Sequence, residues 1–204
     1  MLGMLPVMSL TAYADGTTYN PASTYTGFGD LITNDTEVTI SEVSGKTWYV
    51  IANDNSTVTL LSKDSFGNKA FNSDTSKGNT YGTSEIKTYV DGLTGEGQPL
   101  AGIRSVISDL TLIDIYTADG LSVTKKKGAG EYWWLRSPGT YALDAAYVIG
   151  GSGDVDVYGF PVDTEIGVRP ALKLNLSSVI FSSESNAFSL PVPVTGVTLN
   201  PSTA

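Results

Sequence analysis

Residues 168–176 constrain the fold of this chain more than any other segment, because two kinds of side chain alternate there with a period of two. The two sets are Val168, Pro170, Leu172, Leu174 and Leu176 on one face, and Arg169, Ala171, Lys173 and Asn175 on the other. This period is typical of a β-strand with one buried face. Because proline has no backbone N–H, Pro170 predicts that the strand starts here or lies at a sheet edge.

Two β-hairpins are predicted from shorter segments. Residues 47–52 and 57–62 are rich in aromatic and β-branched residues and flank a polar turn. Residues 145–149 and 155–158 flank a turn rich in glycine. Strand-forming runs on either side of such turns are the usual signal of paired antiparallel strands.

Helical spacing is confined to two short segments. The first has Thr83 as its predicted N-cap and one apolar face made of Ile86, Tyr89, Val90 and Leu93. The second has apolar residues at Leu100, Ile103 and Ile107.

The three lysines at 125–127 predict a solvated loop tip. Together these patterns predict an α+β domain of twisted antiparallel strands with one or two short helices.

The 204 residues include neither cysteine nor histidine. Thiol nucleophiles, Ser-His-Asp triads and metal sites built from thiolate or imidazole are therefore excluded. A domain without disulfides must be stabilised by packing. The formal net charge of −9 makes nucleic acid and the bare membrane surface poor partners, and no membrane insertion is expected.

The composition changes along the chain predict five segments. The apolar first segment ends in Ala12-Tyr13-Ala14, which is typical of a signal-peptidase site and predicts a secreted or cell-surface protein. The expected segments are a signal-peptide remnant at 1–14, a polar lead-in at 15–36, a binding domain at 37–181, a proline-containing linker at 182–193 and the start of a further domain at 194–204.

Three motifs carry a resemblance to a known group. They are Trp-Trp-Leu-Arg-Ser-Pro-Gly at 133–139, Ala-Tyr-Val at 146–148 and Gly-Val-Arg-Pro-Ala-Leu at 167–172. Together they resemble an uncharacterised domain of secreted, multidomain surface proteins of Gram-positive gut bacteria. Residues 194–200 resemble the opening of a bacterial immunoglobulin-like repeat of group 2, which often follows that domain.

The order of these motifs is also similar, more distantly, to the C-type-lectin-like fold, including its formylglycine-generating branch. Gly167-Val168-Arg169 matches the segment that closes the domain there. The resemblance implies a C-type-lectin-like architecture for residues 37–181. The catalytic cysteines of the formylglycine-generating enzymes and the calcium-binding tripeptides of true C-type lectins have no counterpart here, so neither activity is carried over.

Trp133 and Trp134 are adjacent, so on a strand they point to opposite faces. We expect Trp134 to be structural and Trp133 to offer an exposed indole as a platform for a ligand, although both can be structural. Arg136 and Arg169 are expected to be structural. If they are buried, each needs carbonyl groups or a carboxylate, for which Asp144, Asp163 and Glu165 are candidates.

The predicted ligand-binding surface lies around the second hairpin. It comprises Trp133, Tyr141, Asp144, Tyr147, Asp156, Tyr158 and Phe160. Interleaved tyrosines and carboxylates near glycine-rich turns are typical of an adaptable binding surface, and ordinary strand aromatics are the alternative.

Asp154, Asp156 and Tyr158 alternate with Val155 and Val157, so the valines are expected to face the core. For the acidic face three interpretations stay open: a solvated face, weak calcium binding, or paired carboxylates that cleave a glycan.

Ser84 and Lys87 match the spacing of a Ser-Lys nucleophile, but a helix start explains the same residues. We expect a non-catalytic recognition module that needs no cofactor or metal and binds a glycan or a host or neighbour cell-surface protein. The alternatives are a carboxylate-dependent glycan hydrolase and a structural spacer of a surface fibre.

Overall fold

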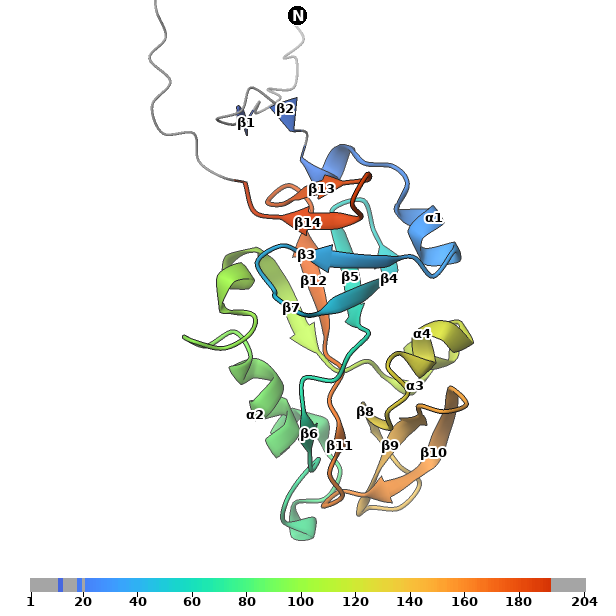
Figure 1. The fold of residues 1–204 in the computed structure, drawn as a ribbon. Helices are drawn as coiled ribbons and strands as arrows, with labels where there is room; N and C mark the ends of the chain where they lie inside the picture. Colours follow the sequence, from blue (N-terminus) through green and yellow to red (C-terminus); the bar gives the residue numbers. More distant parts are fainter. Residues whose placement is uncertain (1–10, 13–17, 20, 192–204) are drawn as a thin grey trace, which may run out of the picture.

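The structure is a computed structural model that describes residues 11–12, 18–19 and 21–191. Most of the predicted signal remnant, and all of the predicted start of a further domain, lie outside the described residues. The described residues form an α+β fold with mostly strands, a few short helices and two twisted, mixed sheets (Figure 1).

The larger sheet has seven strands in the order β13-β14-β3-β4-β5-β12-β7. In chain order they are β3 (Glu37–Ile40), β4 (Thr47–Asn53), β5 (Thr57–Ser62), β7 (Ile107–Thr111), β12 (Ala171–Asn175), β13 (Ile180–Ser182) and β14 (Ala187–Ser189). All pairs are antiparallel except β14 with β3.

The smaller sheet has five strands in the order β10-β9-β8-β11-β6. They are β6 (Asn68–Lys69), β8 (Trp133–Pro138), β9 (Asp144–Ile149), β10 (Asp154–Pro161) and β11 (Ile166–Gly167). The β11–β8 pair is parallel. A separate pair joins β1 (Thr11–Ala12) to β2 (Thr18–Tyr19).

The helices are short. The α-helices are α1 (Phe28–Thr33), α2 (Glu85–Gly92), α3 (Ile115–Asp119) and α4 (Val123–Lys127). The 3₁₀ helices are η1 (Ala22–Thr24), η2 (Thr75–Lys77), η3 (Tyr81–Thr83) and η4 (Ala101–Val106). In the described part of the chain, no helix combines the length and the apolar character that crossing a bilayer requires.

Strand β12 confirms the alternating pattern and also corrects it. It pairs with β5 on one side and β7 on the other, so Pro170 marks the start of a central strand and not an edge. Arg169 and Ala171 are buried although the period places them opposite the leucines, because the smaller sheet covers this end of the strand. Lys173 is half-buried.

Both predicted hairpins and the first predicted helix are confirmed. Helix α2 begins one residue later than expected, since Ser84 and not Thr83 is its N-cap. The second predicted helix is the 3₁₀ segment η4, and Ile107 already belongs to β7.

The folded unit extends beyond the predicted domain on both sides. The polar lead-in contributes α1, whose Phe28 is fully buried and stacks 5.9 Å from Phe188 between ring centroids. Phe188 lies in the predicted linker, where β14 adds a strand beside β3. The apolar residues in these segments are too sparse for a period to be recognised, but they complete one core.

The lysine run is not a loop tip. It forms α4, and the side chain of Lys125 is only 3% exposed. Its ammonium group donates to the backbone oxygen of Ile32 at 2.5 Å and pairs with Asp35. This contact attaches α4 to the end of α1.

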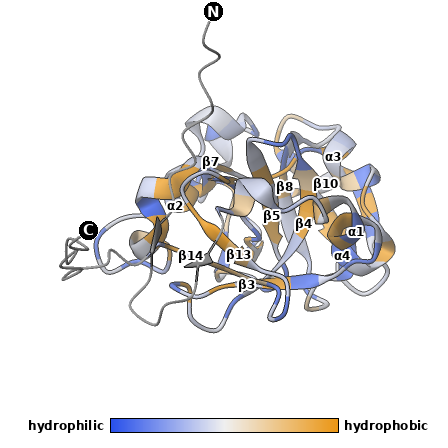
Figure 2. Cartoon of the chain, turned by 90° about the horizontal axis from the view of Figure 1, so that it is seen from above, coloured by the Kyte–Doolittle hydropathy of each residue, from blue (hydrophilic) through white to orange (hydrophobic). Residues whose placement is uncertain are grey.

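The core has three parts. One lies between the larger sheet and α1, and the other two cover opposite faces of the smaller sheet. Figure 2 shows hydrophobic residues in strands of the interior such as β4. Because both faces of the smaller sheet are covered, its strands expose residues mainly at its two edges, β10 and β6, and in its connecting loops.

Candidate functional site

Both adjacent tryptophans are fully buried, so the expectation that Trp133 faces solvent is wrong. They do point to opposite faces of β8: Trp133 packs with Val148 and Trp134 packs with Phe71. Each indole N–H donates to a backbone oxygen, of Lys126 at 2.9 Å and of Lys69 at 2.8 Å. Alternation along the strand was inferred correctly, but it carries no information on whether a second layer covers each face.

Arg169 joins the two most distinctive motifs. Its guanidinium lies over the ring of Trp133 at 4.4 Å. It donates to the backbone oxygens of Ser62 at 2.7 Å, Lys125 at 2.8 Å and Lys126 at 2.9 Å. Two of these are orphan carbonyls at the C-terminal end of α4, where a positive charge is favourable. Burial lowers the pKa of Arg169 to about 10.

Arg136 lies at the opposite end of β8 and is 41% exposed at its side chain. Its guanidinium pairs with Asp114 at 2.5 Å, and none of the three predicted acidic partners is used. Asp114 is the N-cap of α3 and accepts from the backbone N–H of Thr117 at 2.8 Å. Burial acts to raise the pKa of Asp114, but the hydrogen bonds from Thr117 and Arg136 outweigh it and lower this pKa to about 2.

Part of the predicted binding surface is exposed, on two segments that hydrogen bonds join. Tyr141 is 64% exposed and Tyr158 is 67% exposed. Leu143 at 50% and Val157 at 43% lie beside them in sequence and were not predicted. We call these four residues the tyrosine surface. It is formed by the β8–β9 loop and a bulge in β10.

The bulge explains why Val157 is exposed, contrary to expectation. Asp156 faces Tyr147, but Phe160 faces Ala145, so β10 contains two more residues than β9 over this stretch. The extra residues have no partner on β9, and Val157 and Tyr158 in this bulge are exposed. The alternation therefore fails only within the bulge: Val155 before it packs into the core, and Phe160 after it again pairs with Ala145.

Asp156 holds the bulge and is not a free ligand for a metal or substrate. Its Oδ1 accepts from the backbone N–H groups of Tyr158 at 2.9 Å and Gly159 at 3.1 Å. Its Oδ2 accepts from the hydroxyl of Tyr147 at 3.1 Å. Burial and this carboxylate raise the pKa of Tyr147 to about 12. The second acidic residue that was predicted to bind a ligand, Asp144, is half-buried.

The loop that carries Tyr141 is anchored to the bulge. The backbone N–H of Thr140 donates to the oxygen of Tyr158 at 3.2 Å, and its hydroxyl donates to that of Val157 at 3.1 Å. A Cβ atom on Gly139 would lie 2.6 Å from the oxygen of Tyr158, so only glycine permits this approach.

Asn79 completes the support and was missed by the sequence analysis. Its Nδ2 donates to the backbone oxygens of Tyr141 at 3.0 Å and Asp144 at 2.8 Å. A single asparagine in a polar loop carries no signal of such a distant contact.

The remaining predicted aromatics lie beneath this edge. Tyr147 is 6% exposed and stacks on Phe160 with centroids 4.0 Å apart. The ring centroid of Tyr132 lies 6.0 Å from that of each of these two rings, tilted against Tyr147 and edge-on to Phe160. Tyr147 and Phe160 therefore give the surface a rigid base, and Tyr132, which is 48% exposed, extends the aromatic area.

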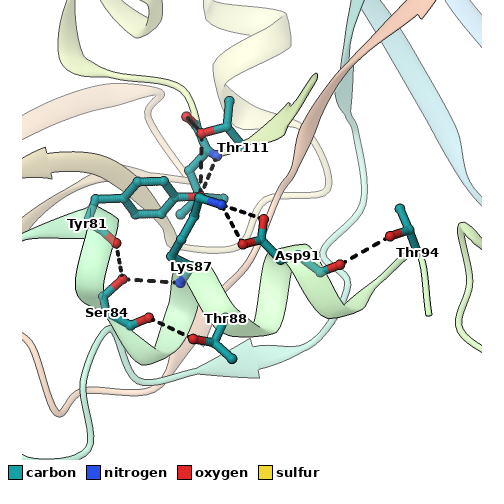
Figure 3. A network of polar contacts seen from close by, with 8 residues as sticks. Tyr81, Ser84, Lys87, Thr88, Asp91, Thr94 and Thr111 are labelled. Atoms are coloured by element: carbon teal, nitrogen blue, oxygen red, sulfur yellow. Dashed lines mark hydrogen bonds and ion pairs between the residues drawn. The ribbon is translucent and has the colours of Figure 1, made fainter. Parts of the chain in front are cut away.

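The Ser84–Lys87 pair has a structural role in α2 (Figure 3). The hydroxyl of Ser84 accepts from the backbone N–H of Lys87 at 3.1 Å and donates to the oxygen of Tyr81 at 2.7 Å. The ammonium group of Lys87 pairs with Asp91, one turn further along the helix. Ser84 is thus an N-cap, and the lysine is directed to another partner.

Among the described residues, no group of three or more acidic, histidine or cysteine side chains is placed to hold a metal ion. Comparisons of the chain with protein-family models, with curated proteins and with solved structures found no match. A functional assignment therefore depends on the residues and their geometry.

Proposed function

We propose that this chain is a non-catalytic recognition module of an exported bacterial surface protein, which binds a glycan or a protein through the tyrosine surface. The observation that carries the proposal is that Tyr141, Leu143, Val157 and Tyr158 are all exposed at one edge of the smaller sheet. Large exposed apolar side chains that cluster on a folded domain are typical of interaction sites.

The backbone under these side chains supports the proposal. Asp156, Asn79 and Thr140 bind both segments through hydrogen bonds, so the tyrosines project from a fixed framework. A tyrosine has only two side-chain torsions and offers a large contact area with a polar end, so ordering it on binding costs little entropy.

We further propose that residues 37–181 contain a variant of the C-type-lectin-like fold. Support comes from the order of the Trp-Trp motif, the glycine-rich hairpin and the closing Gly167-Val168-Arg169 segment. We also propose that the protein is exported, which rests on the apolar sequence at 1–14. The start of a group 2 immunoglobulin-like repeat is proposed from the sequence at 194–200. The proposed recognition needs no cofactor.

The test uses the full chain on an array of glycans, mucins and host proteins, with and without calcium. The variant Tyr141→Ala/Tyr158→Ala should lose binding by roughly tenfold or more, because deleting two contact side chains costs at least about 1.4 kcal/mol. The matched control is Tyr116→Ala, since Tyr116 is 88% exposed but lies on α3. Equal binding by the double variant would refute the assignment, as would turnover of a polysaccharide by the wild type.

A further inference from the structure

A second candidate site lies at the junction of the two sheets. It is a cavity of about 310 Å³ bordered by β4, β5, β7 and β12 of the larger sheet, by β8 of the smaller sheet and by α3. Junctions of this kind are preferred positions for small-ligand sites, and the volume is at the lower end of their range of about 300–1,000 Å³. The cavity thus suits a ligand of about one sugar ring.

Two cationic side chains from different sheets border this cavity, Arg136 from β8 and Lys173 from β12. This is notable because the chain has 12 basic and 21 acidic residues. Of the three guanidinium nitrogens of Arg136, only Nη2 has a hydrogen-bond partner among residues 21–191, and this partner is Asp114. The Nζ of Lys173 has no partner among these residues. Several charged N–H donors therefore remain to bind an anionic group.

The rest of the lining is suited to a hydroxylated ring. Thr59, Thr111 and Thr117 contribute hydroxyl groups from three different elements, and Ile51 and Ile113 contribute apolar surface. Asp109, the cross-strand neighbour of Lys173, adds a carboxylate that can accept from a sugar hydroxyl. A sugar ring has an apolar face, which packs on apolar side chains, and hydroxyl groups at its rim, which form hydrogen bonds.

We infer that this cavity binds an acidic monosaccharide, with its carboxylate between Arg136 and Lys173. The ring hydroxyls would contact the threonines, and the apolar ring face would lie on the isoleucines. The site is separate from the tyrosine surface and does not depend on the function proposed for that surface. Uronic acids and sialic acids share the required chemistry, and the experiment distinguishes them.

The experiment is titration calorimetry of the full chain with D-glucuronate, with N-acetylneuraminate and with D-glucose as the neutral match. We expect one or both acids to bind at least tenfold more tightly than glucose, and the tighter acid identifies the class. Arg136→Gln and Lys173→Gln should each weaken this binding at least tenfold. Arg104→Gln should not, because Arg104 is exposed and does not border this cavity.

Arg136→Gln also breaks the ion pair with Asp114, so a loss of binding in this variant does not by itself separate ligand contact from fold. Lys173→Gln removes a cation without an ion pair and tests the site independently. The Tyr141→Ala/Tyr158→Ala variant should bind the acids as the wild type does, which separates this site from the tyrosine surface. The inference is overturned if the wild type binds neither acid, if glucose binds equally well, or if Lys173→Gln binds like the wild type.

Discussion

Replacing Arg169 by methionine is expected to destabilise the fold more than any surface substitution. Methionine retains an unbranched side chain that can still pack against Trp133, so the change removes mainly the guanidinium and its hydrogen bonds. In the native state the side chain is buried and donates to three backbone oxygens. The oxygens of Ser62 and Lys125 would lose this partner in the variant, whereas the oxygen of Lys126 keeps the indole N–H of Trp133.

The magnitude follows from these contacts. A buried carbonyl left without a donor costs about 1–3 kcal/mol, which gives roughly 2–6 kcal/mol for the two oxygens of Ser62 and Lys125. The variant no longer buries a charge, and this offsets part of the loss. We therefore expect the free energy of unfolding to fall by about 2–4 kcal/mol, a large fraction of the about 5–15 kcal/mol of a typical domain.

Equilibrium unfolding in urea, followed by tryptophan fluorescence, measures this change. Arg104→Met is the matched control, because Arg104 is exposed, and its effect should stay within about 0.5 kcal/mol. Arg169→Lys keeps the charge but lacks the planar fork that reaches three oxygens, so it should recover little of the loss. A decrease below about 1 kcal/mol for Arg169→Met would refute the role assigned to this side chain.

Three further predictions concern a cap and two titrating groups. Ser84→Ala should lower the free energy of unfolding by about 1 kcal/mol, whereas Thr83→Ala should leave it nearly unchanged; the reverse order in urea unfolding would place the N-cap at Thr83. The pKa of Asp114 is lowered, so its stabilisation is present above pH 3.8 and is lost as the pH falls to about 2. The difference in melting temperature between wild type and Asp114→Asn should therefore disappear near pH 2, and a constant difference would contradict the ion pair. The pKa of Tyr147 is raised from 10.0 to about 12, so its stabilisation is lost as the pH rises between these values. In an absorbance titration, one tyrosine should ionise near pH 12 in the wild type and be missing in Tyr147→Phe.

Local sequence patterns predicted the elements that depend on neighbours in the chain. The spacing of Ile86, Val90 and Leu93 identified α2, and the glycine-rich turn identified the β9–β10 hairpin. The same patterns failed at Val157, because this residue lies in a bulge of β10 and has no partner on β9. They also failed at Trp133, where alternation was right but the exposure was wrong.

The candidate site was predictable only in part. Tyr141 and Tyr158 were chosen from their residue type and their place beside glycine-rich turns, and both are exposed. The partner of Arg136 was not predictable, since several acidic residues lie within reach along the chain and only the fold brings Asp114 to it. The cavity at the sheet junction could not be predicted from the sequence either, because its lining comes from six separate elements.

The amino-acid sequence by itself determined the secondary structure of the regular segments, and the lack of imidazole and thiol chemistry. Both are properties of residues and their near neighbours. Only the tertiary structure decided which strand faces are covered, where Arg169 finds its three oxygens, and which tyrosines reach solvent. These contacts join residues far apart, such as Arg169 with Ser62 across 107 positions and Asn79 with Asp144 across 65. Whether a strand face is buried depends on such distant partners, and the local alternation of side chains gives no information about them.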